Sequence, residues 1–183
     1  MDDGLQKLFL FQILSQCEFV LCAADDLHLW LGRSDGPKAM HVFYAIQNLV
    51  SAAANISKAL WGQGGSGSAG RSARRKVLRD RLGIADDSQL RDVAMRNNFD
   101  HFDERLEWWW AQFQQPRGYM DLCIGSDSNL QLFSPADDRF RVLDPEVMVL
   151  TFWGQAFHLD QLIGEVKRIL PRVRAECVGG PWR

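Results

Sequence analysis

The residues best suited to chemistry lie in the segment MRNNFDH, positions 95–101, in which Arg96 and Asn97 precede His101. Arginine binds anionic oxygens through a fixed fork of N–H donors, and histidine can accept or donate a proton near neutral pH. Asn97 and His101 are four residues apart, so their side chains can touch on a helix. These residue types favour a binding or acid–base site. A solvated helix face, with Asp100 paired to Arg96, explains the same pattern.

The segment belongs to a predicted helix from about residue 88 to about residue 114, with Asp86 and Gln89 as its capping box. At roughly 100° per residue its apolar side chains share one face, which we expect to pack on the core. This stripe consists of Met95, Phe99, Phe102, Leu106, Trp109 and Phe113. The motif residues lie off the stripe, and Trp108 lies on the same exposed side as His101. A large apolar side chain beside an exposed histidine indicates a partner surface.

Two long helices precede the motif helix and must position it. The first covers residues 5–31 and has a stripe of Leu10, Leu14, Cys17, Leu21, Ala24, His28 and Leu31. The second begins at Pro37, and its stripe is Val42, Ile46, Leu49, Ala53, Ile56 and Leu60. His28 is expected to be a hydrogen-bonded core or interface residue. Because only a few residues connect the two helices, they should form an antiparallel hairpin.

A basic run separates this hairpin from the motif helix. It follows the Gly/Ser-rich loop 62–70 and covers RSARRKVLRDR, residues 71–81, where Ser72 can cap a short helix. Arg74, Arg75, Lys76 and Arg79 are the candidates for contact with a nucleic-acid backbone. A solvated charged helix is the alternative interpretation.

The pattern becomes β-like after residue 115. YMDLCI and LQLFS flank the turn GSDSN, and RFRVL and VMVLTFW flank DPE, so two β-hairpins are expected. A last amphipathic helix covers about residues 156–175, with Pro171 marking a kink or its end. The predicted fold is therefore mainly α, with a helical bundle over residues 1–115 and a β-hairpin extension plus C-terminal helix over residues 116–183. We expect the two parts to pack as one compact unit.

Composition narrows the class of protein. The 183 residues carry a formal charge of −2, which gives no overall attraction to nucleic acid or membrane. The acidic start MDDG argues against a secretory signal, and no apolar run reaches the ~18 residues of a membrane span. Cys17, Cys22, Cys123 and Cys177 lack the spacing of a metal site. We therefore expect a cytoplasmic protein with reduced thiols, no metal and no cofactor.

The string RNNFDHFDERLEWW resembles the R-x(4–6)-H motif of the HEPN superfamily, and in particular a group of bacterial HEPN-like proteins with an RN-x-[FY]-[DE]-HFDERL signature. The resemblance covers roughly residues 1–115 and implies a HEPN-like helical bundle built on the long hairpin. It implies a metal-independent endoribonuclease, of toxin or defence type, whose composite site forms at a homodimer seam. In such a site His101 is the general acid or base, Arg96 neutralises the scissile phosphate, and Asn97 orients His101 or binds phosphate.

Two further interpretations stay open, and in one of them Arg96 and His101 form intramolecular ion pairs and bind no ligand. Many HEPN-like proteins are non-catalytic, so the resemblance equally allows an interaction module that binds a protein partner, such as an antitoxin, or a nucleotide. The acidic residues of the motif helix, which repel RNA, favour that alternative. Trp108 suits either base stacking on RNA or a dimer interface.

Overall fold

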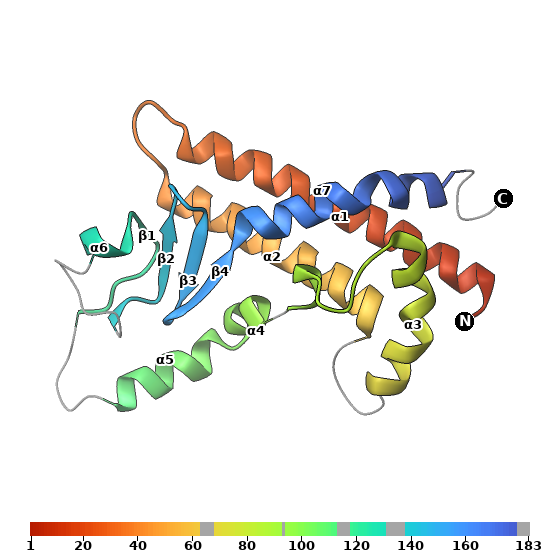
Figure 1. The fold of residues 1–183 in the computed structure, drawn as a ribbon. Helices are drawn as coiled ribbons and strands as arrows, with labels where there is room; N and C mark the ends of the chain where they lie inside the picture. Colours follow the sequence, from red (N-terminus) through yellow and green to blue (C-terminus); the bar gives the residue numbers. More distant parts are fainter. Residues whose placement is uncertain (63–67, 93, 113–117, 131–137, 179–183) are drawn as a thin grey trace. The chain divides into compact units, whose positions relative to one another are not determined.

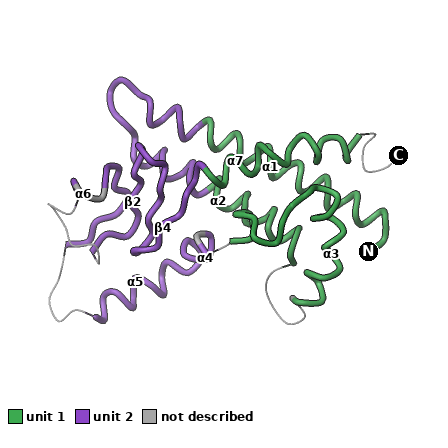
Figure 2. The backbone as a smooth tube through the Cα atoms, in the orientation of Figure 1, with its two compact units in different colours: residues 1–25, 48–93, 161–183 green, residues 26–47, 94–160 purple. Residues whose placement is uncertain are grey.

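The computed structural model describes residues 1–62, 68–92, 94–112, 118–130 and 138–178 (Figure 1). The protein is mainly helical with one small four-stranded sheet, which confirms the predicted class. Its contacts divide into two compact units that interleave along the sequence (Figure 2). Unit 1 comprises residues 1–25, 48–93 and 161–183, and unit 2 comprises residues 26–47 and 94–160. The units therefore divide the chain differently from the boundary predicted near residue 115.

The first two helices are α1, Asp3–Leu31, and α2, Ala39–Trp61, and each contributes to both units. All six residues predicted for the α2 stripe are buried, as the spacing indicated. The buried side of α1 is instead Leu10, Ile13, Cys17, Val20, Ala24 and Leu27. His28 is exposed and is not a core residue. The predicted α1 stripe is confirmed for Leu10, Cys17 and Ala24 alone, because apolar residues surround much of this helix and two stripes fit its spacing.

Contacts between α1 and α2 follow the order of an antiparallel pair (Figure 1). Near the connection, the Trp30 ring stacks on His41 with centroids 4.0 Å apart. Further from it, the Asn55 amide donates to Gln16 Oε1 at 3.2 Å. Residues late in α1 thus meet residues early in α2.

By length and composition α1 is apolar enough to cross a membrane, with a mean hydropathy of 1.4 in its most apolar window. It is the one such helix in the described part of the chain. A third of that window is buried, and core helices of soluble proteins pass the same test. The feature is therefore weak evidence for a membrane span.

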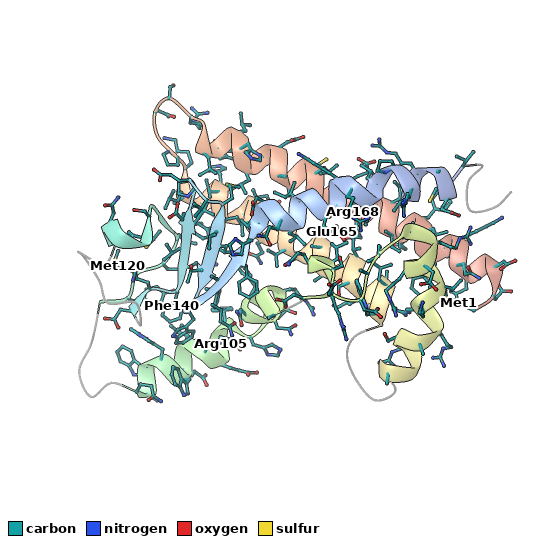
Figure 3. The ribbon with its side chains drawn as sticks, viewed as in Figure 1. Met1, Arg105, Met120, Phe140, Glu165 and Arg168 are labelled. Atoms are coloured by element: carbon teal, nitrogen blue, oxygen red, sulfur yellow. The ribbon has the colours of Figure 1, made fainter. Side chains whose placement is uncertain are left out.

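Unit 1 is completed by α3, Ser68–Leu82, the short 3-10 helix η1, Gln89–Arg91, and most of α7, Leu159–Glu176. The α3 helix begins before Ser72, which is therefore not its cap. The α7 helix continues through Pro171 and buries Ile163, Val166, Ile169, Leu170 and Val173. On α7, Arg168 Nε donates to Glu165 Oε2 at 2.7 Å (Figure 3), and Ser88 donates to the same carboxylate at 2.7 Å. Glu165 thus joins α7 to the start of η1.

Unit 2 holds the sheet and two helices that carry the motif. Its helices are α4, Ala94–Asp100, α5, Phe102–Ala111, and α6, Asp127–Leu130. The strands lie in the order β1, Cys123–Ile124; β2, Arg141–Asp144; β3, Val149–Phe152; and β4, Gln155–His158. Strand β1 is parallel to β2, and the other neighbours are antiparallel.

The hairpin predicted across DPE is confirmed by β2 and β3, and the Asp144 carboxylate accepts from Glu146 N at 3.0 Å in its turn. The hairpin predicted across GSDSN is wrong for residues 127–130, which form α6. The rest of its second strand, 131–134, lies outside the described residues. Residues 155–158 were expected near the start of the last helix but pair with β3 as β4.

An ion pair between Asp121 and Arg141 anchors the sheet. Arg141 Nε donates to Asp121 Oδ1 at 2.8 Å, and both side chains are largely buried. The guanidinium also faces the rings of Phe43 on α2 and Phe99 on α4, at 6.0 and 5.8 Å. Burial raises the pKa of the Asp121 carboxyl, but the hydrogen bonds and charge of Arg141 outweigh it and hold that pKa below its ordinary value.

We expect Asp121→Asn to lower the free energy of unfolding by about 2 kcal/mol at neutral pH, because it removes a charge-assisted hydrogen bond from a partly buried arginine. Since the folded pKa of Asp121 is lowered, its contribution is present above about pH 4 and is lost as the pH falls through the folded value. Urea unfolding at neutral and acid pH measures both effects. The exposed Glu146→Gln is the control, and equal acid sensitivity of D121N and wild type contradicts the prediction.

Candidate functional site

The predicted motif helix is broken where the motif ends. In place of one helix from about residue 88 to 114, the chain forms η1, α4 and α5, and His101 lies at the α4–α5 junction. His101 has φ −112° and ψ 33°, outside helical geometry, and its side chain makes no capping hydrogen bond. The break changes which side chains face inward. Phe102, predicted for the core, is 56% exposed, whereas Asn98 is buried.

The start of the predicted helix differs as well. Ser88, not Asp86, caps η1 by accepting from Leu90 N at 3.3 Å. Asp86 instead pairs with Arg79 Nε at 3.0 Å. Trp109 is buried as the spacing indicated, Leu106 is half-buried, and Phe113 lies outside the described residues.

The three motif residues reach the surface of unit 2. Arg96 Nη2 pairs with Asp100 Oδ2 at 2.5 Å, as the solvated-face interpretation expected. Asn97 is exposed, and the His101 side chain is 59% exposed. Its Nδ1 lies 3.2 Å from Glu104 Oε1. This distance suits a hydrogen bond in which Nδ1–H donates to the carboxylate, and in that tautomer Nε2 is the nitrogen that can accept a proton.

A cavity of about 890 Å³ lies beside His101 within unit 2. The described residues that line it include Asn97, His101, Glu104, Arg105, Trp108 and Trp153, and Arg105 is labelled on α5 in Figure 3. The structure thus brings Asn97, His101 and Trp108 to one hollow. Arg96 is not among these lining residues, and its guanidinium pairs with Asp100.

Three tryptophans, Trp108, Trp109 and Trp153, line this cavity and contact further aromatic rings. The Trp108 and Trp153 rings meet edge to face with centroids 5.7 Å apart, and Trp153 packs on Phe140 at 4.5 Å. Trp109 contacts Phe140 and Tyr119 at 5.5 and 5.9 Å. Trp153 and Asn98 are the residues that sequence reasoning missed. The dipeptide Trp153–Gly154, set after an apolar run, was the available signal for a tight turn.

The basic run is only partly available to a ligand. Arg79 is buried and donates to Leu60 O at 2.8 Å, so it does not belong to the surface expected to bind RNA. Lys76 pairs with Asp80 at 2.6 Å. Arg75 lies over the Phe9 ring at 4.5 Å, and burial together with nearby Arg71 and Arg74 lowers its pKa.

Arg74 is exposed. A second cavity, of about 450 Å³, is lined by residues that include Lys58, Arg71 and Arg75. All of these residues belong to unit 1, whereas Trp108 and the motif belong to unit 2. The five residues predicted to contact RNA therefore do not form one patch within a unit.

The four cysteines are free thiols, and burial together with the nearby Glu18 carboxylate raises the pKa of Cys17 to about 12. Within the described ranges, His, Cys, Asp and Glu side chains form no group that could hold a metal ion. Comparison with models of known families, with curated proteins and with solved structures finds no match. The HEPN resemblance of the motif segment therefore remains an expectation.

We expect Asn98→Ala to destabilise unit 2 by about 1–2 kcal/mol, because the buried Asn98 amide donates to Gln155 Oε1 at 2.9 Å and so fastens α4 to β4. Faster hydrogen exchange of the α4 amides and a lower urea midpoint are the readouts. Asn97→Ala removes the neighbouring exposed amide and should leave both unchanged. Equal behaviour of the two variants would show that Asn98 does not hold α4.

Arg79→Ala should lower the free energy of unfolding by about 2–4 kcal/mol, since it leaves the carbonyls of Leu60 and Ser72 without their guanidinium donor. Arg74→Ala, an exposed change on the same helix, should shift stability by less than about 0.5 kcal/mol. Thermal and urea unfolding compare the two variants. A stable R79A protein would contradict the structural role.

Proposed function

We propose that the protein is a HEPN-like endoribonuclease that acts without a metal, through a composite site made by two copies of unit 2. The observation that carries the proposal is the exposed His101 with its Nδ1 3.2 Å from Glu104 Oε1, because in the tautomer that donates from Nδ1 the Nε2 atom can accept a proton. Arg96 and Asn97 lie within five residues of it, on the helix α4 that ends directly before it. The long α1 and α2 helices supply the hairpin on which a HEPN-like bundle is built.

The proposed reaction follows from these groups. Nε2 of one His101 takes the proton of a ribose 2′-hydroxyl, and that oxygen attacks the adjacent phosphorus. The bond from phosphorus to the 5′-oxygen breaks, and the protonated histidine of the second copy gives that oxygen its proton. The products are a 2′,3′-cyclic phosphate end and a 5′-hydroxyl end. Arg96 stabilises the negative charge on the transferred phosphate after exchanging Asp100 for the substrate.

Exposed apolar residues on α5 support the homodimer. Phe102 and Trp110 are 56% and 64% exposed, although Trp109 on the same helix is buried. Burying such rings against a second copy removes apolar surface from water, and a two-fold seam brings both motifs together. The cytoplasmic location expected from the sequence suits an enzyme that acts on RNA.

A non-catalytic interaction module is the second candidate, and one contact favours it. Arg96 is already neutralised by Asp100, and the exposed carboxylates of Asp103, Glu104 and Glu107 repel a phosphate backbone. Such a surface suits a protein partner, for example a basic antitoxin, or a nucleotide.

The deciding experiment is cleavage of labelled RNA in EDTA by the purified protein, with oligomeric state read from light scattering. We expect a dimer that cleaves RNA to a cyclic phosphate, and a loss of at least about 100-fold in His101→Ala because the general base is gone. Arg96→Ala should lose activity similarly, and the exposed His158→Ala is the matched control. A dimer without cleavage contradicts the nuclease and leaves the interaction module. A monomer contradicts the composite site.

A further inference from the structure

Trp153 occupies a backbone conformation that tryptophan rarely adopts. It has φ +50°, and Gly154 has φ +78°, in the two-residue turn between β3 and β4. Turns with both central residues at positive φ favour Asn-Gly or Asp-Gly, and a bulky side chain there costs about 1 kcal/mol or more. Turn chemistry therefore does not favour a tryptophan at this position, and its indole packs instead against Phe140 and Trp108.

The indole of Trp153 reaches the cavity beside His101. It meets Trp108 edge to face at 5.7 Å with an angle of 66° between the rings, and Trp108 remains 59% exposed. The cavity, at about 890 Å³, lies in the size range of small-molecule sites. One indole thus offers a face on which a flat ring can stack, while the second meets the edge of that ring.

The charged residues around the cavity indicate which kind of ligand ring it can bind. Glu104 and Arg105 both line it with opposite charge. Arg105 disfavours a cation and Glu104 disfavours a compact anion. The Asn97 amide adds a donor and an acceptor. A neutral flat ring with donors and acceptors along its edge satisfies all of these groups, and an unpaired nucleobase has that chemistry.

We propose that this cavity binds one unpaired nucleobase, which stacks on one of the two indoles of Trp108 and Trp153 and meets the other with its edge, while Asn97, Glu104 and Arg105 contact its polar groups. The inference rests on the proposed function, because it names the part of the RNA that the site takes up. His101 lines the same cavity, so the ribose attached to the bound base is the one presented to its Nε2. The cavity thereby gives the cleavage position a base preference.

Binding is tested by saturation-transfer NMR on the full-length protein with adenosine, guanosine, cytidine and uridine, and with ribose alone. We expect transfer to the base protons of at least one nucleoside and none to free ribose. Trp108→Ala and Trp153→Gly should weaken binding about tenfold or more, since each removes one of the two rings that contact the base. Glycine suits the turn at Trp153, and Trp108 is an exposed residue, so both variants should fold. Tyr44→Ala, an exposed aromatic of unit 2 outside the cavity, is the control.

Three results overturn the proposal: no nucleoside binding, equal transfer to ribose, or unchanged binding in both tryptophan variants. RNA cleavage separates this inference from the proposed function. If W153G and W108A cleave with wild-type base preference, the base-binding cavity is wrong while the nuclease stands. If wild type binds nucleosides through both rings but cleaves no RNA, the nuclease is wrong while the cavity stands.

Discussion

The ion pair between Asp121 and Arg141 is the contact on which unit 2 depends. It joins the segment before β1 to the first residue of β2, and so it holds the one parallel pair of the described sheet in register. The same guanidinium lies against Phe43 from α2 and Phe99 from α4. A single cation therefore connects the sheet to the helix that carries the motif, and the aromatic faces partly replace the water that Arg141 loses.

The placement of the motif follows from this attachment. Phe99 also packs on Phe152 of β3, with ring centroids 5.3 Å apart, and the Asn98 amide donates to Gln155 of β4. Two consecutive residues therefore hold the inward side of α4 against the sheet. Asn97 and His101 consequently face outward. Beyond the break at His101, α5 is held separately, by Trp109 in the aromatic group with Tyr119 and Phe140. The cavity lies along these two independently fastened helices.

Much of this arrangement could be predicted from the sequence, and the failures have physical causes. The predictions of the α2 stripe and of the β2–β3 hairpin were correct, because only one choice of inward-facing residues fits the apolar spacing of these segments. The exposure of Asn97, His101 and Trp108 was correct because polar and apolar residues alternate clearly near the motif. The break at His101 was missed because the apolar spacing continues through it, and the separate contacts of Phe99 with Phe152 and of Trp109 with Phe140 are tertiary, which local propensity does not record. Arg79 was placed on the surface because two of its partners are backbone carbonyls, which no side-chain pattern reveals.

The interleaving of the two units also bears on how the chain folds during synthesis. Unit 1 combines residues 1–25 with residues 161–183, whereas every segment of unit 2 lies between residues 26 and 160. A ribosome therefore releases all of unit 2 before the α7 residues that bury Ile163, Val166 and Val173 become available. Until then the apolar side of α1 lacks part of its core. The nascent chain is thus expected to form its motif region while apolar side chains of α1 are still exposed.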